Sequence, residues 1–246
     1  MTTPLKEYTH EYFLTAAQCN AQKELSPQML VQNIIEVATE HANMLGIGFT
    51  RLSAERNIWV LSRLTYELKR YPAMHNHYSL TTWVEDFNRH FSNRCFEIRV
   101  NGNETIGYVR TLWAAINIDT RKAADLTSLS DITNFINDKL CPIARQSRIK
   151  PDGNHTVTTD YTFQVCDIDC NRHVNSGRYV ELIVNQNDLD VYDNRMISRF
   201  EIAFHHEARF GDKVDVRSEK SDDTMIIEIA KGTEPICMSR LFLSNR

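Results

Sequence analysis

The stretch SPQMLVQNIIEVATEHANMLG, residues 26–46, decides the fold of this chain. Ser26 and Pro27 are typical of a helix N-cap and first helical position, and Gly46 is typical of a helix end, so the stretch predicts one helix. Its apolar residues recur mostly at helical spacing, at Leu30, Ile34, Val37, Ala38 and Leu45. Val31 and Ile35 widen this apolar arc beyond that of an ordinary surface helix. We therefore expect a helix that is buried on most sides.

Strand-like segments follow this helix, at residues 57–70, 77–86, 91–101 and 105–118. They are rich in β-branched and aromatic residues, and the turn Asn101-Gly102-Asn103 predicts a hairpin from the last two. A concave sheet is the surface that buries so wide an apolar arc. The pattern therefore predicts a curved antiparallel sheet wrapped around one central helix.

The second half of the chain repeats this plan. Leu61-Ser62-Arg63-Leu64 matches Ile197-Ser198-Arg199-Phe200, and the surrounding pattern predicts a helix at about 175–187 and strands near 196–208, 213–219, 224–231 and 235–243. We expect an α+β tandem: a first repeat at 1–125, a connector at 126–155 and a second repeat at 156–246. The connector carries a short helix candidate that begins at Ser130, has Ile132, Phe135, Ile136 and Leu140 as its apolar stripe, and ends before Pro142.

Composition excludes several classes of protein. The 246 residues carry 28 basic and 32 acidic side chains, a net charge of −4, which disfavours a nucleic-acid binder with a dominant basic field. No apolar run approaches the length of about 18 residues that spans a bilayer, and the N-terminus MTTPLKEYTHEYF lacks a signal-peptide pattern, so we expect a cytosolic protein. A zinc site would need a second pair of ligands at suitable spacing, and none accompanies Cys166, Cys170 and His173. We therefore expect reduced thiols, no metal and no cofactor.

The candidate chemistry lies in VCDIDCNRHVNSGRY, residues 165–179. Asp169, Asn171 and His173 are spaced two apart, which in an extended segment puts all three side chains on one face. The second helix begins just after them, so backbone N–H groups near Val174 and Asn175 are expected to point at the same volume. The alternative is a simple turn and capping segment.

These groups are what a hydrolase of acyl groups needs. A carbonyl under attack develops negative charge on its oxygen, which fixed donors such as the Asn171 amide and helix N–H groups stabilise. His173 can exchange a proton near neutral pH, and Asp169 can orient it. Aligning Tyr161 with Tyr12 places Asn20-Ala21-Gln22-Lys23-Glu24 opposite residues 169–173, so the first repeat has no histidine there.

The run from Asp169 through Asn171 and His173 to Tyr179 resembles the signature of the acyl-acyl-carrier-protein thioesterases, plant plastid enzymes and their bacterial relatives with a tandem hot-dog fold. Phe204-His205-His206-Glu207-Ala208 resembles the site where plant members carry an aromatic, two basic residues, glutamate and cysteine. The resemblance implies that Glu207 is the catalytic glutamate. Ala208 stands in place of the cysteine, so hydrolysis would use a water activated by Glu207, or Glu207 itself as nucleophile.

The resemblance also implies an acyl carrier protein as partner, and fatty acid biosynthesis as the setting. Carrier proteins are acidic, so we expect a basic docking surface, with candidates Arg145, Arg148, Lys150, Arg172, Arg178, Arg209 and Lys213. An acyl channel in the first repeat is expected to be lined by Leu30, Ile34, Leu45, Trp59, Leu61 and Trp83. The open alternatives are an acyl-coenzyme A thioesterase, a non-catalytic acyl-binding module and a dehydratase. A homodimer is also open.

Overall fold

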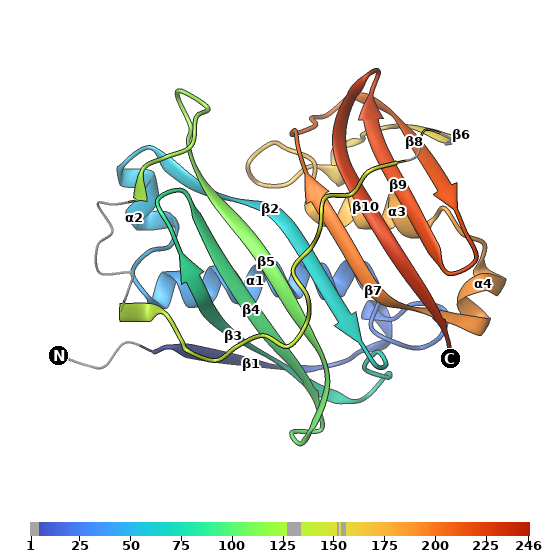
Figure 1. The fold of residues 1–246 in the computed structure, drawn as a ribbon, viewed down its shortest axis with the longest axis horizontal. Coiled ribbons are helices and arrows are strands. Elements are labelled where there is room, and N and C mark those ends of the chain that lie inside the picture. Colours follow the sequence, from blue (N-terminus) through green and yellow to red (C-terminus); the bar gives the residue numbers. More distant parts are fainter. Residues whose placement is uncertain (1–4, 127–133, 152, 154–155) are drawn as a thin grey trace.

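The protein is described by a computed structural model that covers residues 5–126, 134–151, 153 and 156–246. Its strands form one ten-stranded antiparallel sheet with the order β1-β3-β4-β5-β2-β7-β10-β9-β8-β6 (Figure 1). The first half supplies β1 (Glu7–Phe13), β2 (Asn57–Leu68), β3 (His77–Phe87), β4 (Phe91–Val100) and β5 (Glu104–Asn117). The second half supplies β6 (Thr156–Thr162), β7 (Arg195–Phe204), β8 (Lys213–Lys220), β9 (Thr224–Lys231) and β10 (Glu234–Asn245).

This strand order consists of two copies of one five-stranded unit, which meet edge to edge where β2 pairs with β7. Thr65 lies opposite Glu201 at the centre of that pairing. Thr65 and Glu201 are the same number of positions apart as the repeated residues Leu61 and Ile197, so they are equivalent residues of the two repeats. Because equivalent residues pair with each other here, the pseudo-twofold axis of the sheet passes through this point. The double hot-dog fold expected from the sequence is confirmed.

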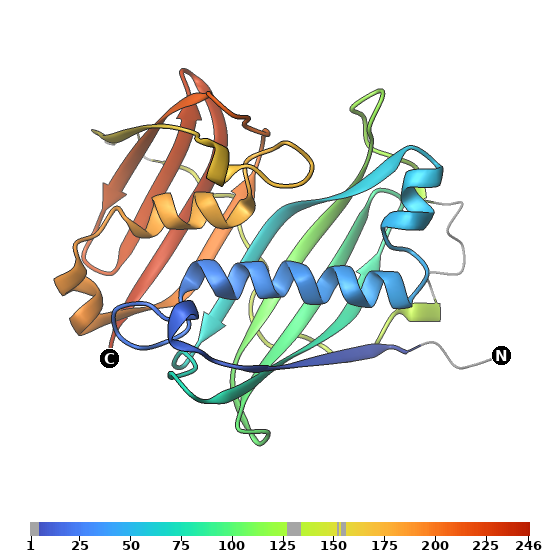
Figure 2. The ribbon, with the colours of Figure 1, turned by 180° about the vertical axis from the view of Figure 1, so that it is seen from behind.

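Two central helices, α1 (Pro27–Met44) and α3 (Ser176–Val184), lie side by side on the same face of the sheet (Figure 2). The Ser26 side chain caps α1 by accepting a hydrogen bond from the Met29 N–H at 3.3 Å, and Gly46 takes a left-handed φ of 71° just after the helix. Two short helices, α2 (Phe49–Ala54) and α4 (Leu189–Asn194), precede β2 and β7; the sequence reasoning did not predict them. None of the helices in the described ranges is long and apolar enough to cross a membrane.

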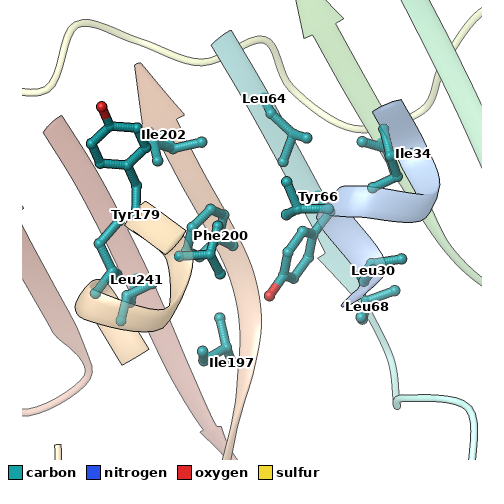
Figure 3. Packing of buried hydrophobic residues seen from close by; sticks show 14 of the residues in the cluster. Leu30, Ile34, Leu64, Tyr66, Leu68, Tyr179, Ile197, Phe200, Ile202 and Leu241 are labelled. Carbon is teal, nitrogen blue, oxygen red and sulfur yellow. The ribbon is translucent and has the colours of Figure 1, made fainter. Parts of the chain in front are cut away.

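One hydrophobic core serves both halves. Leu30 and Ile34 of α1 face the β2 side chains, as Figure 3 shows. Tyr66 of β2 stacks on Phe200 of β7, with ring centroids 5.2 Å apart and planes 11° from parallel. Because this stack lies on the strand pair that joins the repeats, the two halves share buried surface rather than merely touching.

The connector runs across the opposite face of the sheet from α1 and α3 (Figures 1 and 2). The Trp83 indole N–H donates to the Lys139 carbonyl at 2.7 Å, and Arg110 donates to the carbonyls of Cys141 and Ile143 at 2.7 Å each. These side chains fasten the connector backbone to this face of the sheet.

Two sequence expectations are corrected on this face. The candidate helix cap Ser130 and Ile132 lie outside the described residues, but from residue 136 to 150 the chain contains no helix and Leu140 is 80% exposed, so the predicted connector helix is wrong there. Trp83 packs beneath the connector with Lys139 over its ring, and therefore does not line a channel beside α1.

Candidate functional site

The segment with the predicted chemistry is a tight turn between the 3-10 helix η3 (Val165–Asp167) and α3. Ile168 and Val174 form an isolated antiparallel bridge, and the Asp169 N–H donates to the His173 carbonyl at 2.8 Å. Arg172 adopts a left-handed φ of 66° inside the turn. The expectation of an extended segment with three side chains on one face is therefore wrong, because the backbone reverses between Asp169 and His173.

Asp169 holds this turn. Its Oδ1 accepts hydrogen bonds from the N–H groups of Asn171 at 2.8 Å and His173 at 3.1 Å. An Asp side chain that bonds the backbone two residues ahead stabilises a turn directly. Asp169 thus acts on the backbone that carries Asn171 and His173, rather than on the imidazole ring.

His173 and Glu207 meet across two segments that are distant in sequence. His173 Nε2 lies 3.2 Å from Glu207 Oε2, and the two side chains are 21% and 26% exposed. Glu207 follows the end of β7, and the Val174 N–H donates to the Ala208 carbonyl at 2.9 Å, which fastens the two segments together. The contact that the sequence hypothesis requires is present, at a site open to water.

Arg121 is a third member of this cluster that the sequence reasoning missed. It lies just past β5 of the first half, with a left-handed φ of 57°, and its guanidinium donates to the same Glu207 oxygen that faces His173. The two residues are 86 positions apart, so no local pattern could have linked them. The candidate site is therefore built from both halves of the chain.

The two backbone groups predicted to hold an oxyanion already have acceptors. The Val174 N–H donates to Ala208, as above, and the Asn175 N–H donates to the Asp167 carbonyl at 2.8 Å. The Asn175 side chain caps α3 by accepting from the Gly177 N–H at 2.8 Å. The expectation that Val174 and Asn175 hold an oxyanion is therefore wrong, because both N–H groups are already bonded. Asn171 is exposed, and its side-chain amide makes no hydrogen bond among the described residues.

The predicted docking residues divide into two groups. Three of them form ion pairs with acidic neighbours: Arg145 with Asp86 at 2.7 Å, Arg178 with Asp167 at 3.2 Å and Lys213 with Asp160 at 3.1 Å. The other four are exposed and make no ion pair within the part of the chain that the structure describes: Arg148, Lys150, Arg172 and Arg209. Two of these, Arg172 and Arg209, flank the site in sequence.

This chain has no thiol where the family resemblance implies a cysteine. Ala208 is fully buried there, and the nearby Cys166 and Cys170 are exposed. Across the described ranges, no three His, Cys, Asp or Glu side chains gather as a metal site would require. The polar groups that remain for chemistry are the His173 imidazole, the Glu207 carboxylate, the Arg121 guanidinium and the Asn171 amide.

Comparison with known proteins matches both halves of the chain. Residues 5–134 match the acyl-ACP thioesterase N-terminal domain and residues 150–240 the acyl-ACP thioesterase C-terminal domain. A crystal structure of an acyl-ACP thioesterase from Bacteroides thetaiotaomicron is 33% identical, with a TM-score of 0.92 over 99% of this chain and 100% of that one. The 12:0-ACP thioesterase from Umbellularia californica, 16% identical, has a TM-score of 0.86 over 98% of each chain, which shows the fold alone.

Curated relatives include the chloroplastic oleoyl-acyl carrier protein thioesterase of Coriandrum sativum, 22% identical over 90% of this chain, and oleoyl-acyl carrier protein thioesterase 2 of Arabidopsis thaliana, 20% identical over 92%. The chain spans 65% and 66% of the length of these two plant proteins.

Proposed function

We propose that this chain, which belongs to the acyl-ACP thioesterase family, is a thioester hydrolase. It hydrolyses the thioester of an acyl carrier protein to a free fatty acid and the carrier thiol. The observation that supports this most directly is the approach of His173 Nε2 to Glu207 Oε2 at 3.2 Å, in a cluster completed by Arg121. An imidazole and a carboxylate at this separation can share one water and move its proton.

The proposed reaction proceeds by general base catalysis. Glu207 takes a proton from a water molecule, whose oxygen attacks the thioester carbon, and His173 assists the transfer. The Asn171 amide donates to the oxygen that becomes negative, a contact of the kind that contributes roughly 3–4 kcal/mol to transition-state stabilisation. The carbon–sulfur bond then breaks, the thiolate receives the proton, and the acid leaves. The alternative assignment exchanges the acid and base roles of Glu207 and His173.

Free-thiol release from acyl-carrier and acyl-coenzyme A substrates of matched chain length tests the proposal. Glu207→Ala, His173→Ala and Asn171→Ala should each lower kcat roughly tenfold or more with an unchanged thermal unfolding midpoint, since each removes a group that acts on the reacting atoms. His206→Ala is the matched control, because His206 is about half exposed and pairs with Glu234 outside the cluster. Turnover unaltered in all three site variants would refute the assignment.

The carrier-bound ester is the proposed substrate because the exposed Arg172 and Arg209 lie next to His173 and Ala208 in the chain. An acidic carrier that docks on this basic pair delivers its thioester to the adjacent cluster. The proposed role is to end chain elongation in cytosolic fatty acid biosynthesis. A homodimer stays a prediction that sedimentation would measure.

A further inference from the structure

The first half contains a second copy of the catalytic turn. Cys19 and Leu25 form the isolated bridge there, and the Asn20 N–H donates to the Glu24 carbonyl at 2.8 Å. The Asn20 Oδ1 accepts from the N–H groups of Gln22 at 3.1 Å and Glu24 at 3.0 Å, as Asp169 does in the second half. The matching left-handed residue has a φ of 62° and is Lys23. The turn in the first half therefore has the same hydrogen bonds as the turn in the second half.

The reactive groups of the catalytic copy are absent from this one. Glu24 stands at the position of His173, and Gln22 at that of Asn171. The Leu25 N–H donates to the Pro72 carbonyl at 2.9 Å, as Val174 does to Ala208, so Tyr71 stands at the position of Glu207. Tyr71 is buried and donates to the Ile197 carbonyl at 3.1 Å. This copy has no imidazole and carboxylate pair to activate water.

A cavity of about 390 Å³ opens beside the unreactive turn, between it and the end of the second-half helix. It lies near α4 and the C-terminal end of β10, which Figure 2 shows next to the start of α1. Val184, Leu189, Met196 and Ile197 give it apolar surface. Gln22 and Asn187 also line it; their amide N–H groups donate to Asp193 at 2.8 Å and to the Tyr192 hydroxyl at 3.3 Å, so their amide oxygens are the groups left to accept from a ligand. Its volume falls within the range of about 300–1,000 Å³ typical of small-molecule sites.

The charges around this cavity select against an anionic ligand. Arg246 is the cation that lines it, and Arg246 is already paired with Glu24 at 2.7 Å. Asp188 also lines the cavity and adds negative charge. Among the described lining residues there is therefore no unpaired cation that could bind a carboxylate or a phosphate. A neutral chain could instead pack its apolar groups on the apolar lining and hydrogen-bond its amides to the polar lining.

We infer that this cavity is a second, non-hydrolytic site for the pantetheine arm, the neutral, amide-bearing chain that carries the acyl group on a carrier protein or on coenzyme A. The choice of this arm rests on the proposed function, since the lining residues Asn20, Gln22 and Tyr71 stand at the positions of Asp169, Asn171 and Glu207 in the proposed thioester site. The protein would bind one arm for hydrolysis and hold a second without cleaving it.

Methyl-resolved NMR titration of the full chain with pantetheine tests this inference. We expect saturable shifts of the Leu189, Met196 and Ile197 methyl groups. Ala21→Trp should abolish these shifts, since exposed Ala21 lines the cavity, whereas Ala17→Trp, the same substitution at an exposed position outside the lining, should preserve them. Absence of saturable shifts in the unmodified chain, or their persistence in Ala21→Trp, would overturn the inference.

Two further titrations identify the source of the arm. If only holo-carrier protein shifts the same methyl groups, the arm that binds here is the one on the carrier. If only coenzyme A shifts them, the arm is the one on the nucleotide. If neither shifts them, the inference that the cavity is a physiological site is overturned. Because the readout is binding at named methyl groups, it is independent of turnover. Shifts without hydrolysis would remove only the proposed function, and hydrolysis without shifts would remove only this inference.

Discussion

Asp169 and Asn20 occupy the same position in the two copies of the turn, and each side-chain oxygen accepts from the same two backbone N–H groups. The turn was expected to be distinctive because only the second copy has a histidine. The hydrogen bonds show instead that an amide does in one half what a carboxylate does in the other. The side chains that the turn presents separate the halves, above all His173 against Glu24 at its end.

This equivalence predicts the outcome of two substitutions. Asp169→Asn should keep kcat within about twofold, because an amide oxygen accepts the same two bonds, whereas Asp169→Ala should cost about 1–2 kcal/mol of stability and lower kcat as the turn loosens. Steady-state kinetics and urea unfolding measure both. A large loss of kcat in a fully folded Asp169→Asn variant would show that the negative charge itself takes part in the reaction.

His41 gives a stability prediction that depends on pH. This fully buried side chain of α1 donates to the Leu5 carbonyl at 2.9 Å and accepts from Arg94 at 2.6 Å. Burial and the adjacent Arg94 charge lower the pKa of His41 to about 4.

The unfolded chain, with an ordinary histidine pKa of about 6.5, therefore takes up this proton first. Stability from neutral His41 is complete above about pH 6.5 and is lost as pH falls toward 4, by about 3 kcal/mol at most. His41→Gln should flatten the difference in free energy of unfolding between pH 7 and pH 4.5 relative to the unmodified chain. Equal pH dependence in both proteins would contradict this account.

Much of the framework could be predicted because its signals are local. The wide apolar arc of residues 26–46 specified α1, and alternation with Asn-Gly turn chemistry specified β4 and β5 (Phe91–Val100 and Glu104–Asn117). The turn at residues 169–173 was misread as extended, because its shape depends on the left-handed Arg172, a residue type that rarely adopts that conformation. Arg121 and Trp83 were missed or misplaced because their partners come from distant segments of chain.

The pairing of β2 with β7 should make the two halves unfold together. Phe200→Ala removes the partner of Tyr66 from a fully buried stack, and we expect a loss of about 3–5 kcal/mol in the free energy of unfolding. Fluorescence and far-UV circular dichroism should still report one coincident transition. Phe210→Ala is the control, because Phe210 is 61% exposed. Two separated transitions would show that the repeats are independent domains.

The distribution of charge over the molecule predicts how salt acts on substrate binding. The chain is acidic overall, with a net charge of −4, yet Arg172 and Arg209 are exposed beside the candidate site. Raising ionic strength should increase KM for the acyl-carrier substrate more than for the acyl-coenzyme A analogue, since the Debye length shortens to about 8 Å at 0.15 M salt.

Charge reversal isolates the contribution of these two arginines. Arg172→Glu combined with Arg209→Glu should reproduce the high-salt KM at low salt, while the already paired Lys213→Glu should have a smaller effect. Identical responses of both substrates would argue against electrostatic docking.

The connector that crosses the outer face of the sheet has a genetic consequence. Two separate copies of a single half, encoded by one gene, would present the same residue at both turns, so any substitution that ruined one site would ruin its twin. Because the connector joins the halves into one polypeptide, positions 24 and 173 can carry different residues. Covalent linkage thus allows a histidine at one turn and a glutamate at the other, a difference that a symmetric assembly of identical subunits cannot encode.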